Sequence, residues 1–171
     1  MAPGSAPCAA RTSTTSRTRT TRSEAIRAGQ RSSRFVNSSE RRGRAAVVLR
    51  DETRIALIRR VRDRHTYFVF PGGDIRGDET PADAATREAH EELGVQVVLG
   101  PRLLIEEFRG QTVHYFSGLI VGGDFGTGTG DEMRGSGTTD RGTYEPVWME
   151  LHDLLHYDVR PRALAAILTG G

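Results

Sequence analysis

The sequence contains one cysteine and no lysine among its 171 residues. Because Cys8 is the only thiol, disulfide bonds within the chain and metal sites built from several thiolates are excluded. No apolar stretch is long enough to span a membrane and no hydrophobic signal core is present, so we expect no membrane partner. A cytoplasmic setting is the simplest expectation.

Charge is distributed unevenly along the chain. Residues 1–43 hold nine arginines and two glutamates, a net charge of +7; because the whole chain carries +2, residues 44–171 carry −5. The first segment is also rich in Ser and Thr and lacks apolar periodicity, so it is predicted to be a basic, disordered tail. An organellar transit peptide and a tail that contacts nucleic acid are the alternatives for it. We expect one folded domain over residues 44–171, whose negative charge argues against nucleic acid as its partner.

Residues 81–93 are predicted to form a helix with a defined start and end. Thr80 is a favoured N-cap, Pro81 suits the first helical position, and Asp83 can return the capping hydrogen bond. Gly94 suits the left-handed residue that follows a helix.

Three glutamates crowd the last part of this helix. Glu88 and Glu92 are four residues apart, a like-charged spacing that costs an isolated helix about 0.2–0.5 kcal/mol, and Glu91 lies beside them. At 100° per residue they border an apolar stripe of Ala82, Ala85, Ala89 and Leu93, while Asp83, Thr86, Arg87 and His90 are predicted to face solvent. Such carboxylates suit a hard divalent cation such as Mg²⁺, and a solvated acidic face is the alternative.

Residues 73–95 resemble the Nudix box: glycine, five residues, Glu, seven residues, then Arg-Glu-apolar-any-Glu-Glu-any-Gly-apolar. The matching positions are Gly73, Glu79, Arg87, Glu88, Ala89, Glu91, Glu92, Gly94 and Val95. Two departures are present. Arg76-Gly77-Asp78 replaces the Glu-x-Gly that often precedes the first glutamate of the motif, and the small Ala89 occupies the aliphatic position. Neither departure removes a ligand.

The resemblance implies roles for individual residues. The implied ligands of Mg²⁺ or Mn²⁺ are Glu88, Glu91, Glu92 and a backbone carbonyl of Gly72 or Gly73. The implied catalytic set is Glu88, Arg87 and Glu91. Within it Arg87 orients the glutamates, Glu79 braces the loop against the helix, and the identity of the general base stays open.

The resemblance also implies a reaction, metal-dependent hydrolysis of a phosphoanhydride bond in a nucleoside diphosphate-linked small molecule. Such a reaction mainly requires positioning and charge neutralisation, which carboxylate-bound cations supply. By elimination among substrate signatures, a nucleoside triphosphate that gives a monophosphate and pyrophosphate is the first expectation. A nucleotide-sugar pyrophosphatase and a non-catalytic, nucleotide-sensing Nudix module are the alternatives, and a homodimer stays open.

The remaining patterns predict an α/β fold that is similar to the Nudix α/β/α sandwich, a mixed β-sheet between helices. Expected strands cover residues 45–49, 55–58, 67–70, 95–98, 103–108, 113–121 and 146–149, the first two as a hairpin. Expected helices besides 81–93 cover residues 151–155 and 162–168.

Further site residues are expected outside the box. Arg59 and Arg60 end a strand that in the family often runs beside the substrate, so they are expected to bind its phosphates. A glycine-rich segment, residues 122–142, is predicted to be a surface loop or a flap over the substrate. A further ligand or base could come from the acidic residues Asp131, Glu132, Asp140 and Glu145, and spacing does not decide among them.

Overall fold

The computed structural model describes residues 43–130 and 142–170. The strands are β1 (Gly43–Asp51), β2 (Arg54–Arg62), β3 (His65–Val69), β4 (Gly72–Asp74), β5 (Val95–Phe108), β6 (Gln111–Gly123), β7 (Thr143–Glu150) and β8 (Val159–Arg160). The helices are α1 (Pro81–Glu88), which continues as the π-helix η1 (Ala89–Leu93), the 3₁₀ turn η2 (Leu151–Asp153) and α3 (Arg162–Thr169).

The strands form a mixed sheet that is organised around β1 and β2. The path through the sheet runs β5-β6-β1-β2-β3-β8, with β4 paired to β1 and β7 paired to β2. β1 runs parallel to β6 and β3 runs parallel to β8, whereas the other pairs are antiparallel. Strand β1 therefore lies between the strand that opens the box, β4, and the β5–β6 hairpin.

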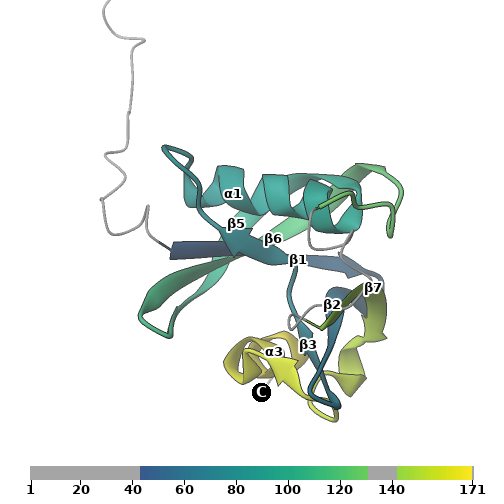
Figure 1. The fold of residues 1–171 in the computed structure, drawn as a ribbon. Helices are drawn as coiled ribbons and strands as arrows, with labels where there is room; N and C mark the ends of the chain where they lie inside the picture. Colours follow the sequence, from purple (N-terminus) through teal and green to yellow (C-terminus); the bar gives the residue numbers. More distant parts are fainter. Residues whose placement is uncertain (1–42, 131–141, 171) are drawn as a thin grey trace, which may run out of the picture. The chain divides into compact units, whose positions relative to one another are not determined.

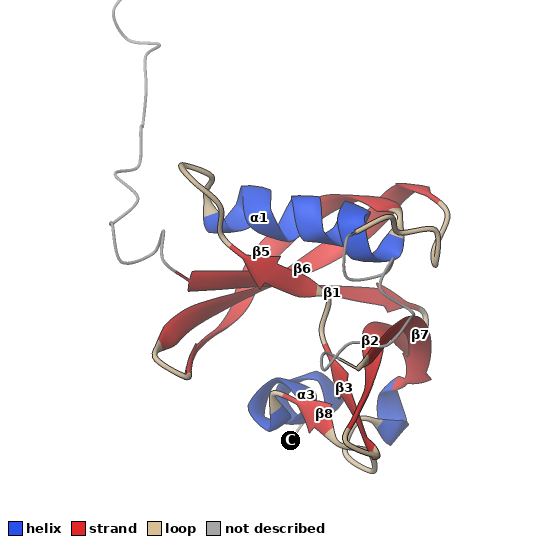
Figure 2. Ribbon diagram, viewed as in Figure 1, coloured by secondary structure: helices blue, strands red, loops and turns tan. Residues whose placement is uncertain are grey.

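Helices cover both sides of the strands. Figure 1 shows α1 along β1, β5 and β6, and α3 beside β8; Figure 2 shows the strands between the two helices. The buried cluster on the α3 side includes Ala46, Val48, Ile55, Leu57, Phe68, Leu154 and Leu164. The cluster on the α1 side includes Val47, Leu49, Ala56, Ile58, Ala89 and Leu93. Successive residues of β1 and β2 thus pack alternately into the two clusters, because side chains along a strand point to opposite faces of the sheet. The predicted α/β/α arrangement is confirmed.

Three predicted elements differ from the observed ones. β1 and β2 pair only at their joined ends, Arg50 with Ile55 and Asp51 with Arg54, because beyond them each strand pairs with other partners. The two strands predicted over residues 95–108 form the single strand β5, whose register shifts between Leu99 and Arg102. The helix predicted over residues 151–155 is one 3₁₀ turn followed by further turns.

Within residues 43–130 and 142–170, no helix has the length and apolar character needed to cross a membrane.

Candidate active site

The start of α1 is fixed by the predicted capping box. The Thr80 hydroxyl accepts a hydrogen bond from the Asp83 N–H at 3.1 Å, and the Asp83 carboxylate accepts one from the Thr80 N–H at 3.1 Å. Pro81 occupies the first helical position. Gly94 follows the helix with φ 79°, the left-handed conformation that was predicted for it. Local sequence therefore sets both ends of the segment that carries the glutamates.

The second half of this helix is a π-helix rather than the α-helix that the sequence predicted. η1 covers Ala89–Leu93 and contains Glu91 and Glu92. Single π-helical turns inside α-helices are rare and recur at functional sites. Because the π turn is wider, a spacing of 100° per residue no longer describes the direction of these side chains.

Two of the three glutamates are buried. The exposed fractions of Glu88 and Glu92 are 6% and 7%, so both side chains are covered by the rest of the domain. The Glu92 carboxylate accepts a hydrogen bond from the Gly72 N–H at 2.7 Å. A Cβ on Gly73 would collide with the Glu88 carboxylate. The two glycines of β4 therefore bring backbone against both carboxylates, the close approach that glycine permits.

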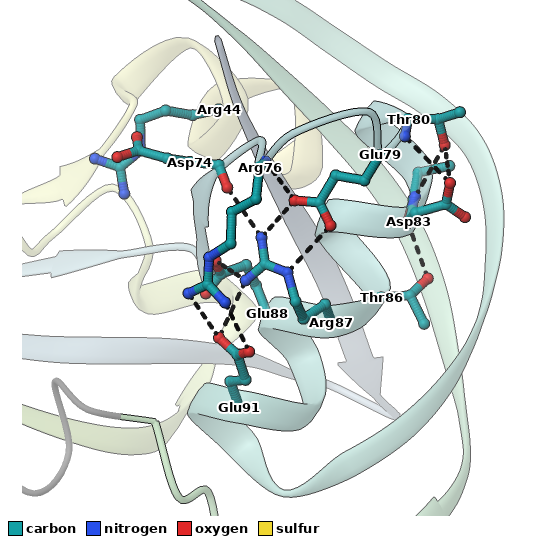
Figure 3. A network of polar contacts seen from close by, with 11 residues as sticks. Arg44, Asp74, Arg76, Glu79, Thr80, Asp83, Thr86, Arg87, Glu88 and Glu91 are labelled. Atoms are coloured by element: carbon teal, nitrogen blue, oxygen red, sulfur yellow. Dashed lines mark hydrogen bonds and ion pairs between the residues drawn. The ribbon is translucent and has the colours of Figure 1, made fainter. Parts of the chain in front are cut away.

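Arg87 lies at the centre of the polar network in Figure 3. Its Nη2 donates to Glu79 Oε1 at 2.7 Å and to the Asp74 carbonyl at 2.9 Å, and its Nε donates to Glu79 Oε2 at 3.2 Å. Its Nη1 donates to Glu88 Oε1 at 2.5 Å and to Glu91 Oε2 at 3.0 Å. One guanidinium thus joins three carboxylates and the loop backbone, which its planar fork of donors allows.

The prediction that Arg87 faces solvent was wrong, since its side chain is only 21% exposed. The loop that joins β4 to α1 lies against this side of the helix and supplies the Asp74 carbonyl and the Glu79 carboxylate as partners. A helical projection of one segment contains no information about a loop that packs on it.

The network alters the acidity of its members. Hydrogen bonds from Arg87 hold the pKa of Glu79 below its usual value, and the hydrogen bond to Glu79 raises the pKa of Arg87. Burial raises the pKa of Glu88, and the hydrogen bond from Arg87 acts in the opposite direction. Glu88 is therefore a carboxylate whose charge is costly in its place and depends on nearby cations.

Glu79 connects the loop to the helix. One of its carboxylate oxygens accepts both the Arg76 N–H, at 2.6 Å, and the Arg87 guanidinium. The same carboxylate thus fixes the loop backbone and the arginine of the helix. The bracing role that the resemblance implied for Glu79 stays a prediction.

Arg76 is a member of the network whose role the sequence did not predict. Its Nη1 and Nη2 donate to the two carboxylate oxygens of Glu91, each at 3.1 Å. The available signal was the arginine at a position where the resembling family often has glutamate. This difference places a positive charge near the acidic cluster, but it does not identify Glu91 as the partner.

The donor set suits a hard divalent cation, although its oxygens are engaged by protein groups. Glu88, Glu91 and Glu92 offer carboxylate oxygens, the ligands that Mg²⁺ and Mn²⁺ prefer. Within the described residues, no three acidic, histidine or cysteine side chains converge on one cation position. Arg87, Arg76 and the Gly72 N–H hydrogen-bond carboxylate oxygens of these three glutamates.

The two arginines predicted to bind substrate lie on opposite faces of β2. Arg60 shares its face with Ala56 and Ile58, which pack with the η1 helix, so Arg59 points to the other face. The Arg60 guanidinium lies 3.3 Å from the centre of the Tyr144 ring and 5.9 Å from that of Tyr67. Strands β7 and β3 supply these two rings on either side of Arg60.

Arg59 pairs with one of the predicted further ligands. Its Nη1 donates to the Glu145 carboxylate at 2.8 Å across β2 and β7. The other acidic residues considered for this role, Asp131, Glu132 and Asp140, lie outside the described residues.

The described part of the glycine-rich segment packs on the end of η1. The Gly126 N–H donates to the Leu93 carbonyl and the Gly130 N–H donates to the Glu91 carbonyl, both at 2.8 Å. These bonds satisfy carbonyls that a helix end leaves without partners. The segment between residues 124 and 130 is thus joined to the backbone of the acidic turn.

Fold and site together define a domain in which a loop and the following helix present three glutamates that arginines organise. The chain belongs to the NUDIX family, since the NUDIX domain matches residues 39–167. This membership confirms the predicted resemblance and the predicted class of enzyme, a Nudix pyrophosphohydrolase.

Solved structures share the fold at low sequence identity. A NUDIX hydrolase from Nitrosomonas europaea is 19% identical over 75% of this chain and 86% of its own, with a TM-score of 0.56. MutT, described for Aliivibrio salmonicida and Vibrio cholerae, is 19% identical over 75% of this chain and 97% of its own, with a TM-score of 0.53. An ADP-ribose pyrophosphatase from Streptococcus suis is 18% identical over 75% of this chain and 89% of its own, with a TM-score of 0.52. No curated protein matches the sequence.

Proposed function

We propose that this protein hydrolyses a phosphoanhydride bond of a nucleoside diphosphate-linked small molecule, with Mg²⁺ or Mn²⁺ held by Glu88, Glu91 and Glu92. The observation that carries the proposal is the burial of two of these carboxylates against the backbone of Gly72 and Gly73. Buried carboxylates need compensating charge, and a divalent cation supplies it together with a place for substrate oxygens.

The residues of the network have separate tasks in this reaction. When bound, the cation neutralises phosphate oxygens and lowers the pKa of a coordinated water. Arg87 acts as a positioning residue, because its hydrogen bonds fix the directions of the Glu88 and Glu91 carboxylates. Glu79 binds both Arg87 and the loop backbone, and so fixes their positions relative to each other. The protein thus contributes mainly preorganisation, which is what in-line displacement at phosphorus requires.

The substrate is proposed to be a nucleoside triphosphate, cleaved to a monophosphate and pyrophosphate. Of the two arginines at the end of β2, Arg60 is the better candidate for a substrate contact, because it shares the face of the sheet on which η1 packs. Tyr67 and Tyr144 flank it and offer ring surfaces on the same face. Nucleotide sugars remain the second substrate class, and ADP-ribose is added because the Streptococcus suis structure is named for it.

The test is release of phosphate or pyrophosphate from nucleoside triphosphates, nucleotide sugars, ADP-ribose and dinucleoside polyphosphates, with Mg²⁺ or Mn²⁺. We expect turnover of one class and a loss of at least about a hundredfold in kcat for Glu92→Gln, because a misplaced metal or phosphate forfeits the preorganised charge. Glu52→Gln, the same charge change in the turn between β1 and β2, is the matched control and should keep full activity. Full turnover by Glu92→Gln would disprove the proposed metal site.

A chain that binds a nucleotide and Mn²⁺ without hydrolysing any member of the panel would instead be a nucleotide-sensing module. The chain keeps all three glutamates, with Glu88 and Glu91 joined by Arg87 and Glu92 bound by the Gly72 N–H, and this speaks against that outcome.

A further inference from the structure

Arg76 combines a fixed backbone with an exposed side chain. Its N–H donates to the Glu79 carboxylate at 2.6 Å, and its carbonyl accepts the Glu79 N–H at 3.1 Å. The preceding residue, Ile75, is 9% exposed and packs with Ala84 and Ala85 of α1. The Arg76 side chain is nevertheless 61% exposed. Any movement of its guanidinium therefore needs only rotation of the side chain, not displacement of the loop.

The two arginines that bind Glu91 differ in their other commitments. Arg87 also holds Glu79, Glu88 and the Asp74 carbonyl. Among the described residues, the Arg76 guanidinium hydrogen-bonds Glu91 alone, through both of its terminal nitrogens (Figure 3). Arg76 can thus leave Glu91 without disrupting the rest of the network, whereas Arg87 cannot.

A bidentate arginine uses the same carboxylate oxygens that a divalent cation would use. Both oxygens of the Glu91 carboxylate accept hydrogen bonds from Arg76, and Oε2 also accepts one from Arg87. A cation that binds Glu91 has to replace at least one of these donors, and it brings two charges close to a guanidinium. Among the described residues, Arg76 and Arg87 share three carboxylates, those of Glu79, Glu88 and Glu91, so two guanidinium charges leave part of this negative charge for a cation.

We propose that Arg76 competes with the divalent cation for Glu91 and so sets the cation concentration at which the site fills. The inference rests on the proposed function, because it assumes that Glu91 binds the cation. Arg76 has a regulatory role here: it holds the Glu91 carboxylate, and the cation displaces it by rotation of the arginine side chain.

The direct test is the affinity for Mn²⁺, measured by isothermal titration calorimetry without nucleotide. Loss of an ion pair of this exposure should lower the Kd of Arg76→Gln about two- to fivefold relative to wild type. Arg76→Lys should fall between them, because lysine keeps the charge but cannot bind both oxygens in a planar fork. Arg62→Gln, which removes an exposed arginine paired with Asp63, is the matched control and should leave the Kd unchanged.

The possible outcomes separate this inference from the function itself. Wild type that binds Mn²⁺ while Arg76→Gln binds it equally or more weakly would overturn the competition and leave the metal site intact. Binding that appears only in Arg76→Gln would support the competition. Absence of binding in both proteins would overturn the competition and the proposed metal site together. Melting curves recorded without Mn²⁺ confirm that each variant is folded.

Discussion

At the scale of single residues, the site depends on two glycines, Gly72 and Gly73, as much as on the glutamates. Gly73 lies against the Glu88 carboxylate, and the Gly72 N–H binds Glu92. The box residues could be predicted because their spacing along the chain is itself the signal. The ion pair between Arg76 and Glu91 could not, because it depends on the course of a loop and on one choice of side-chain rotamer.

Gly73→Ala should damage catalysis more than folding. The added Cβ meets the end of the Glu88 side chain rather than backbone, so we expect that side chain to rotate away while the fold is retained. A displacement of this size in a preorganised site costs about a hundredfold in kcat. The measurements are kcat at saturating Mg²⁺ and the melting temperature.

Gly77→Asn is the control for this variant. Gly77 has φ 52° with nothing within 4 Å of an added Cβ, and asparagine tolerates the left-handed region. We expect it to keep most of the activity. If Gly73→Ala also retained full activity, the close approach of Gly73 to Glu88 would have no catalytic role.

At the scale of elements, strand period and helix ends were predictable, whereas strand partners were not. The short apolar runs of residues 45–49 and 55–58 predicted two strands, and they exist, but a hairpin forms only at their joined ends. Each strand pairs elsewhere along most of its length, β1 with β6 and β2 with β7. Those partners lie far along the chain, so local sequence contains little information about them. The π-helix η1 likewise follows no pattern that we can identify in the sequence.

The β3–β8 pair supplies a prediction about pH. The Asp158 carboxylate accepts hydrogen bonds from Arg160 at 2.6 and 3.0 Å and contacts His65 Nε2 at 2.8 Å. These interactions, Arg160 first, lower the pKa of Asp158 to about 2 from 3.8. A lowered pKa in the folded protein means that the carboxylate adds stability at neutral pH, and that this contribution is lost as the pH falls from 3.8 towards 2.

Asp158→Asn should therefore reduce the free energy of unfolding at pH 7 by less than about 1 kcal/mol, since the side chain is partly exposed. The difference from wild type should shrink at pH 3. Urea unfolding at both pH values measures it. Asp63→Asn, at a 91% exposed carboxylate, is the control and should change nothing. A difference that stays constant between pH 7 and pH 3 would contradict the assignment.

At the scale of the whole molecule, charge separates the chain into two parts. Residues 1–42 contain all nine arginines and both glutamates of the basic segment, so the remaining residues carry −5. The first residue that the structure describes is Gly43, whose carbonyl accepts the Ile75 N–H at 2.9 Å. A truncation must therefore end at residue 42.

We expect the protein without residues 1–42 to keep its turnover and its melting temperature within about 2 °C of the full chain, because a surface change of below about 0.5 kcal/mol has an effect of this size. It should bind an anion exchanger at pH 8, as its charge of −5 requires. Fluorescence anisotropy with a labelled DNA duplex at low salt shows whether the removed residues bind nucleic acid. A loss of turnover would assign them a part in the reaction.

Strand β1 has a consequence for how this protein can vary. An added Cβ on Gly72 would collide with Ala45 and Ala46, so no spare space separates β1 from β4, the strand that carries the glycines of the site. We expect a larger residue at Ala46 to displace Gly72, and with it the site, while the domain stays folded. In a genetic screen, such an allele should therefore score as inactive although the cell still accumulates the protein. Directed evolution of new substrate preferences would have more freedom at the ends of β2 and β7 than in this strand.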